Sequence, residues 1–131
     1  MNALTPPELP PAVRRLFTEL AHAGAPAPGS LGLVQGEAGS LAEGVQIRFF
    51  WQVEGSQIRT ARFQAYGCPY TLAACEWLAR ALPGRTRERP WPGDPHQWAE
   101  ALEAPPERLG RFLVIEDALR AAQAAWSGQP G

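Results

Sequence analysis

Lysine is absent from this 131-residue sequence, and all twelve of its basic residues are arginine. Thirteen acidic residues oppose them, so the formal net charge is −1. A chain with so little net charge has no overall field that would draw it to nucleic acid or to an anionic membrane surface. We therefore expect neither of these as a partner.

Long hydrophobic runs are missing as well. No segment approaches the roughly 18 consecutive apolar residues that a membrane-spanning helix needs. The first residues, MNALTPPELPP, lack the charged and apolar regions of a secretory signal. The sequence therefore predicts a protein that neither spans a membrane nor is exported, and we expect it in the cytoplasm.

Cysteine is scarce, with only Cys68 and Cys75 in the chain. Both fall in one predicted helix, where seven steps of about 1.5 Å separate their Cα atoms by roughly 10.5 Å. A disulfide needs a separation below about 7 Å. Both thiols are therefore expected to stay reduced, as is usual in the cytoplasm.

The motifs of familiar enzymes and metal sites are also lacking. The sequence has no GxSxG, P-loop, GxGxxG, CxxC or HExxH run. Neither His22 nor His96 has a cysteine or carboxylate at a metal-ligand spacing, and both are expected at the surface. We therefore expect no enzymatic activity.

The residues that are present fit one domain over 1–131, with an ordered core at about 10–126 and flexible ends. Apolar and polar side chains alternate over 45–53, interrupted only by Phe50, and again over 57–66. This alternation predicts two strands, which the turn residues 54–56 join into an antiparallel hairpin. A further short strand is predicted at 31–36, and the glycine-rich segment 36–44 is predicted to be a loop.

Helical periodicity predicts four helices, at about 10–24, 68–82, 94–103 and 112–126. Pro69 suits the first helical position after Cys68, and Asp94 suits the N-cap of the third helix. The order of elements predicts an α+β fold, in which helices pack on one face of a small antiparallel sheet of about three strands.

Local chemistry singles out Cys68. A thiol at a helix start faces the positive end of the helix dipole and unpaired backbone N–H groups, which lower its pKa. Gly67 leaves room for a ligand or partner to approach the sulfur. A buried structural thiol is an equally good interpretation of this pattern, whereas Cys75, further along the same helix, is expected in the core.

Residues 61–68, ARFQAYGC, resemble the second cysteine motif of the IscU/NifU-type scaffold proteins that build iron-sulfur clusters. The segment 36–44 stands at the place of that family's first cysteine loop, and residues 116–122 resemble its final helix. The resemblance covers about residues 10–126. It implies a SufE/NifU-like fold and a role in iron-sulfur cluster assembly.

The resemblance also implies which ligands are missing. The family's first ligand cysteine aligns at about Leu41, and its third aligns with Arg111, so only Cys68 of the three is kept. Glu43 lies near the position of the family's loop aspartate. The resemblance thus gives Cys68 and Glu43 as metal ligands, with the other donors coming from a second chain or a partner. It gives Arg111 as a partner of the Cys68 thiolate or of Glu43.

The chaperone motif of the family has a degenerate counterpart in Pro105, Pro106, Glu107 and Arg108. The resemblance implies a cysteine desulfurase or other assembly proteins as partners, and allows an oligomer. The bound group would be an iron-sulfur cluster, iron or zinc, and a chain that binds none of these is also compatible with the lost cysteines.

Three functions therefore stay open. The first is an accessory scaffold that binds assembly partners and holds a cluster weakly or only as an oligomer. The second is a thiol protein that accepts a persulfide on Cys68. The third is an interaction module that kept the fold without the cluster chemistry.

Overall fold

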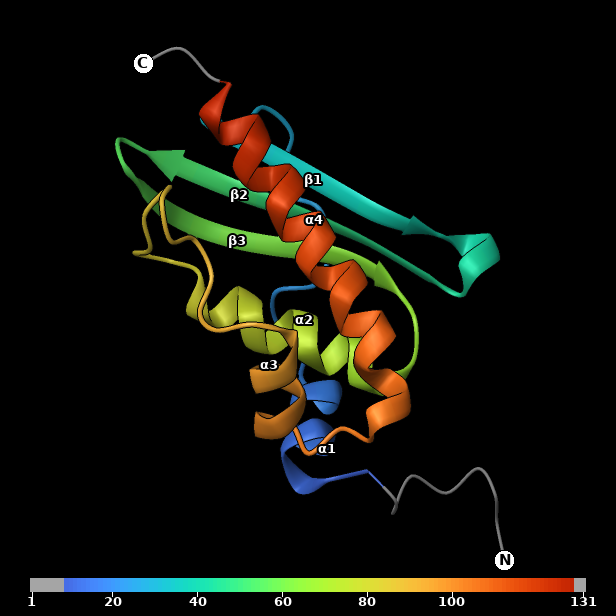
Figure 1. Ribbon diagram of the computed structural model, residues 1–131. Coiled ribbons are helices and arrows are strands. Elements are labelled where there is room, and N and C mark those ends of the chain that lie inside the picture. Colours follow the sequence, from blue (N-terminus) through green and yellow to red (C-terminus); the bar gives the residue numbers. More distant parts are fainter. Residues whose placement is uncertain (1–8, 129–131) are drawn as a thin grey trace, which may run out of the picture.

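The computed structural model describes residues 9–128, and the chain ends expected to be flexible lie largely outside this range. Within it, the elements follow in the order α1 (Pro11–Thr18), β1 (Leu33–Ser40), η2 (Leu41–Glu43), β2 (Val45–Glu54), β3 (Gln57–Tyr66), α2 (Pro69–Ala81), α3 (Pro95–Ala101), η3 (Pro106–Arg108) and α4 (Leu109–Ser127). The strands form one antiparallel sheet in the order β1-β2-β3. Figure 1 shows α4 lying across this sheet, with α2 beside it. The predicted α+β class and three-stranded sheet are confirmed.

The hairpin of β2 and β3 confirms the prediction from alternating side chains. Phe49 lies opposite Phe63, and their ring centroids are 6.4 Å apart. Every second side chain of β2 turns toward the helices and is buried, because the strand has a period of two. These residues are Val45, Ile47, Phe49 and Trp51.

Phe50 interrupts the alternation because it is buried on the outer face of the sheet, away from the helices. Arg62 is its partner on β3 and donates hydrogen bonds to the carbonyls of Ala23 and Gly24, at 2.8 and 3.2 Å. Gln52 is the next residue of β2 that points outward, and its side-chain amide donates to the carbonyl of Leu31 at 3.1 Å. The connector between α1 and β1 thus runs past the outer face on both sides of Phe50.

The first strand is longer than the sequence indicated, and the predicted loop at 36–44 is wrong over 36–40. β1 continues through Gly36 to Ser40 and pairs with β2 along this length. A Cβ on Gly36 would overlap the backbone of Ala118 and Ala122 in α4. The glycine therefore marks a close approach of helix to strand rather than a loop.

All four predicted helices are present, and two of them, α1 and α4, have a bound that differs from the prediction. α2 has Cys68 as its N-cap, as predicted. The Asp94 carboxylate caps α3 by accepting from a backbone amide at 2.9 Å. α1 ends at Thr18 rather than near 24, since Glu19 leaves the helical conformation. α4 begins at Leu109 rather than at 112, directly after η3.

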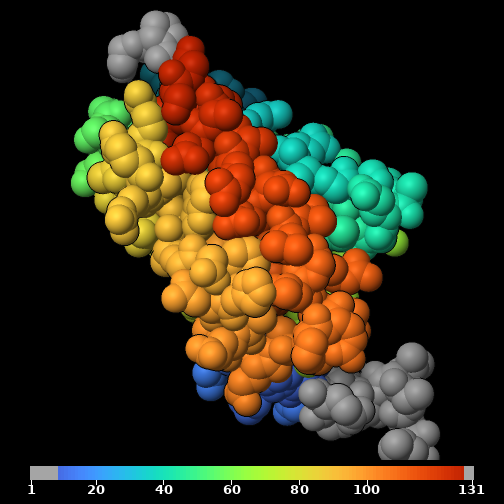
Figure 2. All heavy atoms as spheres, in the orientation of Figure 1, coloured from blue at the N-terminus to red at the C-terminus, as the bar shows by residue number. Residues whose placement is uncertain are grey.

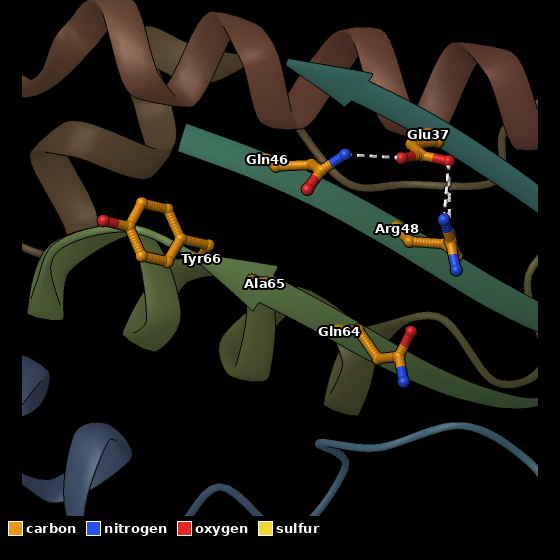
Figure 3. Close-up of a pocket in the computed structure, with 6 residues that line it drawn as sticks. All are labelled: Glu37, Gln46, Arg48, Gln64, Ala65 and Tyr66. Atoms are coloured by element: carbon orange, nitrogen blue, oxygen red, sulfur yellow. Dashed lines mark hydrogen bonds and ion pairs between the residues drawn. The ribbon is translucent and has the colours of Figure 1, made fainter. Parts of the chain in front are cut away.

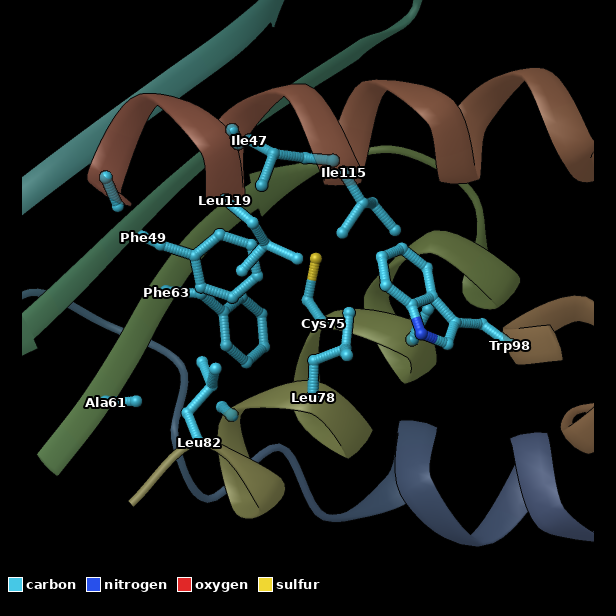
Figure 4. Close-up of a cluster of buried hydrophobic side chains, with 14 of the residues drawn as sticks. Ile47, Phe49, Ala61, Phe63, Cys75, Leu78, Leu82, Trp98, Ile115 and Leu119 are labelled. Atoms are coloured by element: carbon cyan, nitrogen blue, oxygen red, sulfur yellow. The ribbon is translucent and has the colours of Figure 1, made fainter. Parts of the chain in front are cut away.

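The core lies between the sheet, α2 and α4, with Trp98 of α3 at its edge (Figure 4). Cys75 points into it and is fully buried, which confirms the prediction of a core thiol. Burial raises the pKa of Cys75 far above its usual range, and the adjacent Glu76 carboxylate adds to this. Figure 2 shows one face of the molecule, on which α4 and the segment 83–104 cover the middle and β1 with the β1–β2 loop lies at the side. None of the described helices is long and apolar enough to cross a membrane.

Candidate functional site

Cys68 lies at the junction where β3 leads directly into α2. It is half-buried and forms no disulfide. Pro69 occupies the first position of α2, where its missing N–H costs no hydrogen bond. A Cβ on Gly67 would press against the side chain of Thr71 at 2.9 Å, so the glycine permits the tight turn that brings the thiol to the helix start.

The surroundings of the Cys68 thiol favour the thiolate. Burial by itself raises the pKa of Cys68, but hydrogen bonds and a nearby charge outweigh this effect. The Thr71 hydroxyl lies 3.4 Å from Sγ, and the backbone amides of Thr71 and Tyr70 also donate to the sulfur. The guanidinium of Arg108 adds a favourable positive charge. The pKa of Cys68 therefore lies below that of an ordinary cysteine, as expected for a thiol at a helix N-terminus.

Arg108 is the cation that acts on this thiol. Its guanidinium carbon lies 5.8 Å from the centroid of the Tyr70 ring, a cation–π geometry that holds the side chain beside the start of α2. Within residues 9–128, its Nε atom is buried and has no hydrogen-bond partner. The sequence presented Arg108 only as part of the degenerate chaperone motif. Its role at Cys68 depends on the packing of η3 against α2, which no local pattern reveals.

Arg111 and Glu43 lie at the loop between β1 and β2. Nη1 of Arg111 donates to the carbonyl of Gly44 at 2.9 Å, so the first turn of α4 is tied to this loop. Glu43 is exposed and is hydrogen-bonded to Ser40, which donates to its carboxylate at 3.0 Å and caps η2. The Arg111 guanidinium thus contacts the backbone of Gly44, the residue that follows Glu43. Its pairing with the Glu43 carboxylate or with the Cys68 thiolate stays a prediction.

The donors in the described residues do not fit a complete metal site. No group of three or more histidine, cysteine, aspartate or glutamate side chains in residues 9–128 is placed to hold a metal ion. A [2Fe–2S] cluster takes four ligands, usually cysteine, and structural zinc takes four N or S donors. Residues 9–128 of one chain therefore do not present such a donor set by themselves.

The remaining predicted positions belong to three separate segments of the chain, which are α3, η3 and the residues that follow α1. Pro105, Pro106 and Glu107 form the exposed or half-exposed connection between α3 and α4. His96 is exposed, as expected. His22, also expected at the surface, is instead half-buried, with its Nδ1 atom 2.7 Å from the Glu76 carboxylate. Nothing in the local sequence pairs these two residues, which are 54 positions apart.

A shallow polar hollow of about 230 Å³ lies on the outer face of the sheet (Figure 3). The Glu37 carboxylate accepts hydrogen bonds from Gln46 at 2.8 Å and from Arg48 at 2.9 Å across the strands. Tyr66 stands at one end of the hollow, two residues before Cys68, and is largely exposed. The surface beside the candidate site therefore consists of polar side chains that bond to one another, together with the exposed ring of Tyr66.

Comparison with known proteins gives a consistent result. A family model described as the NifU-like N-terminal domain matches residues 12–131. The iron-sulfur cluster assembly scaffold protein IscU of Haemophilus influenzae is 31% identical over 74 residues, which cover 56% of this chain. The match covers 59% of the Haemophilus protein, which is less than two thirds of its length.

Two solved structures have a similar fold at low sequence identity. The N-terminal part of a nitrogen-fixing NifU-like protein from Brucella abortus has a TM-score of 0.70 at 13% identity, covering 92% of this chain and 95% of that one. A putative iron-sulfur cluster assembly scaffold protein for the SUF system, from Fervidobacterium islandicum AW-1, has a TM-score of 0.65 at 14% identity. It covers 87% of this chain and 95% of its own. At such identities the two structures support the fold alone.

Proposed function

This chain belongs to the NifU-like N-terminal domain family, and we propose that it acts as a scaffold-like accessory protein in iron-sulfur cluster assembly. The observation that carries the proposal is the half-buried Cys68 thiol at the start of α2, with its lowered pKa. Thiolate is the form of cysteine that binds metal. Its partners would be a cysteine desulfurase or other assembly proteins, and the protein would work in the cytoplasm without being an enzyme.

In this proposal the iron-sulfur cluster, or its iron, is cargo rather than a resident cofactor. Cys68 and Glu43 supply ligands, and the other donors come from a second copy of the chain or from a partner protein. This division follows from the single ligating thiol and from the lack of a three-donor group in residues 9–128. Zinc, which accepts similar donors, would be held in the same way.

Anaerobic reconstitution with ferrous iron, cysteine and a cysteine desulfurase tests the scaffold function. Native mass spectrometry should show cluster mass on species that contain two chains, or one chain and the desulfurase. Cys68→Ser should remove this mass, whereas Cys75→Ala should keep it, since the Cys75 thiol is fully buried. A cluster on single chains, or an equal cluster content in Cys68→Ser, would contradict the proposed ligand set.

The lowered pKa of Cys68 also favours a second function, in which the thiol accepts sulfur. The Cys68 thiolate would attack the terminal sulfur of a protein persulfide. A sulfur–sulfur bond to Cys68 forms, the sulfur–sulfur bond of the donor breaks, and the donor cysteine leaves as a thiolate. No oxidant is required, because the oxidised sulfur is supplied by the donor.

Persulfide labelling after incubation with a loaded cysteine desulfurase tests this second function. The label should appear on wild type and on Cys75→Ala, and should be absent from Cys68→Ser. If neither persulfide nor cluster depends on Cys68, the chain would be an interaction module without cluster chemistry.

A further inference from the structure

A second cluster of charged groups lies inside the molecule, between α2 and the segment that follows α1. Glu76 of α2 is fully buried, and its carboxylate accepts three hydrogen bonds. The backbone amide of His22 donates to Oε1 at 2.9 Å. The His22 ring and the Nε of Arg80 each approach Oε2 at 2.7 Å. When the carboxylate is ionised it can only accept hydrogen bonds, and Nδ1 of His22 is then the donor.

His22 is at the same time joined to the sheet. Its carbonyl accepts from the amide of Phe63 at 3.0 Å, and the amide of Gly24 donates to the Phe63 carbonyl at 2.7 Å. The segment beside β3 therefore meets both α2 and β3 at this one residue. β3 and α2 are the two elements that meet at Cys68.

The rest of the N-terminal arm, which we define as residues 9–24, is attached by the packing of α1 on α2 and by Arg62 of β3, which donates to the carbonyls of Ala23 and Gly24. α1 has eight residues, too few for a helix that is stable by itself, and Pro10 gives it no side-chain cap. Val13 and Leu16 are its buried side chains. Helix α1 packs on α2. Directly after the last residue of α1, the exposed carbonyl of Glu19 accepts a hydrogen bond from Arg80 of α2 at 2.9 Å. Figure 1 shows α1 on the side of α2 that faces away from the sheet.

We propose that Glu76 is a latch that holds the N-terminal arm on α2 and β3, and that the arm detaches as a unit when this carboxylate is lost. Within residues 9–128, Glu76 is the fully buried carboxylate. Detachment of the arm would take away both the His22 amide that donates to Oε1 and the His22 ring that contacts Oε2, and these contacts offset the cost of burying the carboxylate. Val13 and Leu16 are the arm's members of the buried core cluster, and most of its other members come from the sheet, α2 and α4. We therefore expect these elements to stay folded when the arm is released.

Hydrogen exchange and limited trypsin digestion test the latch, because the arm contains the exposed cleavage residues Arg14 and Arg15. In Glu76→Gln, amides of residues 12–24 should exchange at least ten times faster than in wild type, and cleavage at these arginines should accelerate similarly. Amides of β2 and α4 should keep their protection. Glu54→Gln is the matched control, since its carboxylate is exposed and pairs with Arg59 at 3.3 Å.

His22→Ala provides a second variant that leaves Glu76 and Arg80 in place, and it carries the same test if Glu76→Gln does not fold. It should also release the arm selectively, to a smaller degree, because Arg80 still neutralises the carboxylate. Unchanged protection of the arm in both variants would overturn the proposal. Equal acceleration throughout β2, α4 and the arm would overturn it too, since Glu76 would then be an ordinary part of the core.

Discussion

The two cysteines lie on one helix, yet their surroundings give them opposite chemistry. Cys68 receives hydrogen bonds from Thr71 and Tyr70, and its pKa is lowered despite partial burial. Cys75 is enclosed by apolar side chains, and burial raises its pKa. A thiol-specific reagent at neutral pH should therefore modify Cys68 and leave Cys75 unmodified in the folded protein.

Arg108 is the residue whose charge should be measurable at Cys68. Arg108→Gln should raise the pKa of Cys68, because it removes the positive charge that favours the thiolate. The measurement is the rate of Cys68 alkylation as a function of pH, in protein that also carries Cys75→Ala. The double variant with Arg108→Gln should reach half of its maximal rate at a higher pH than Cys75→Ala alone. The matched control is Arg111→Gln, whose guanidinium bonds to Gly44. If Arg111→Gln shifts the profile and Arg108→Gln does not, the assignment of the cation is reversed.

Cys75→Ser should destabilise the protein, because the serine hydroxyl would be buried among apolar side chains. The expected loss in the free energy of unfolding is about 1–3 kcal/mol. Urea denaturation measures it, with Cys68→Ser as the control at a half-buried position. An equal loss in both variants would show that the Cys75 site is less apolar than the structure indicates.

At the scale of elements, the sequence predicted those strands and helix ends that are specified by neighbouring residues. The alternation over 45–53 and 57–66 predicted the hairpin, and the Cys68-Pro69 pair marked the start of α2. The second half of β1 was missed, because small residues usually indicate a loop. Gly36 occurs there for a non-local reason, since α4 packs directly against the strand. Neither sequence spacing nor propensity reveals that contact.

Gly36→Ala tests the close approach of α4 to β1. The added methyl group would meet the backbone of Ala118 and Ala122, which can yield only if the helix shifts. We expect a loss of about 1–3 kcal/mol in the free energy of unfolding, as for other overpacked sites.

Gly110→Ala in the first turn of α4 is the control for this change. A Cβ there meets nothing within 4 Å, so its effect should stay below about 1 kcal/mol and be stabilising. Thermal or urea unfolding of the two variants makes the comparison. A tolerated Gly36→Ala would mean that β1 and α4 are further apart than described.

At the scale of the whole molecule, the candidate site was only partly predictable. Cys68 could be chosen from its own neighbours in the sequence, since glycine, proline and a helix start surround it. Arg108 lies 40 residues away and reaches the thiol through tertiary packing. The contact of Arg111 with Gly44 likewise joins positions 67 residues apart. A single sequence carries no signal for such pairs.

The most direct measurement is the iron and acid-labile sulfide content of protein isolated without oxygen from its own cells, for wild type and Cys68→Ser. If Cys68 is a ligand of a scaffold-like protein, wild type should carry both elements, at no more than one cluster per two chains or per chain-partner complex. Cys68→Ser should carry neither, while remaining folded. Wild type free of iron and sulfide, or a variant that retains both, would contradict the proposed role of Cys68 in cluster assembly.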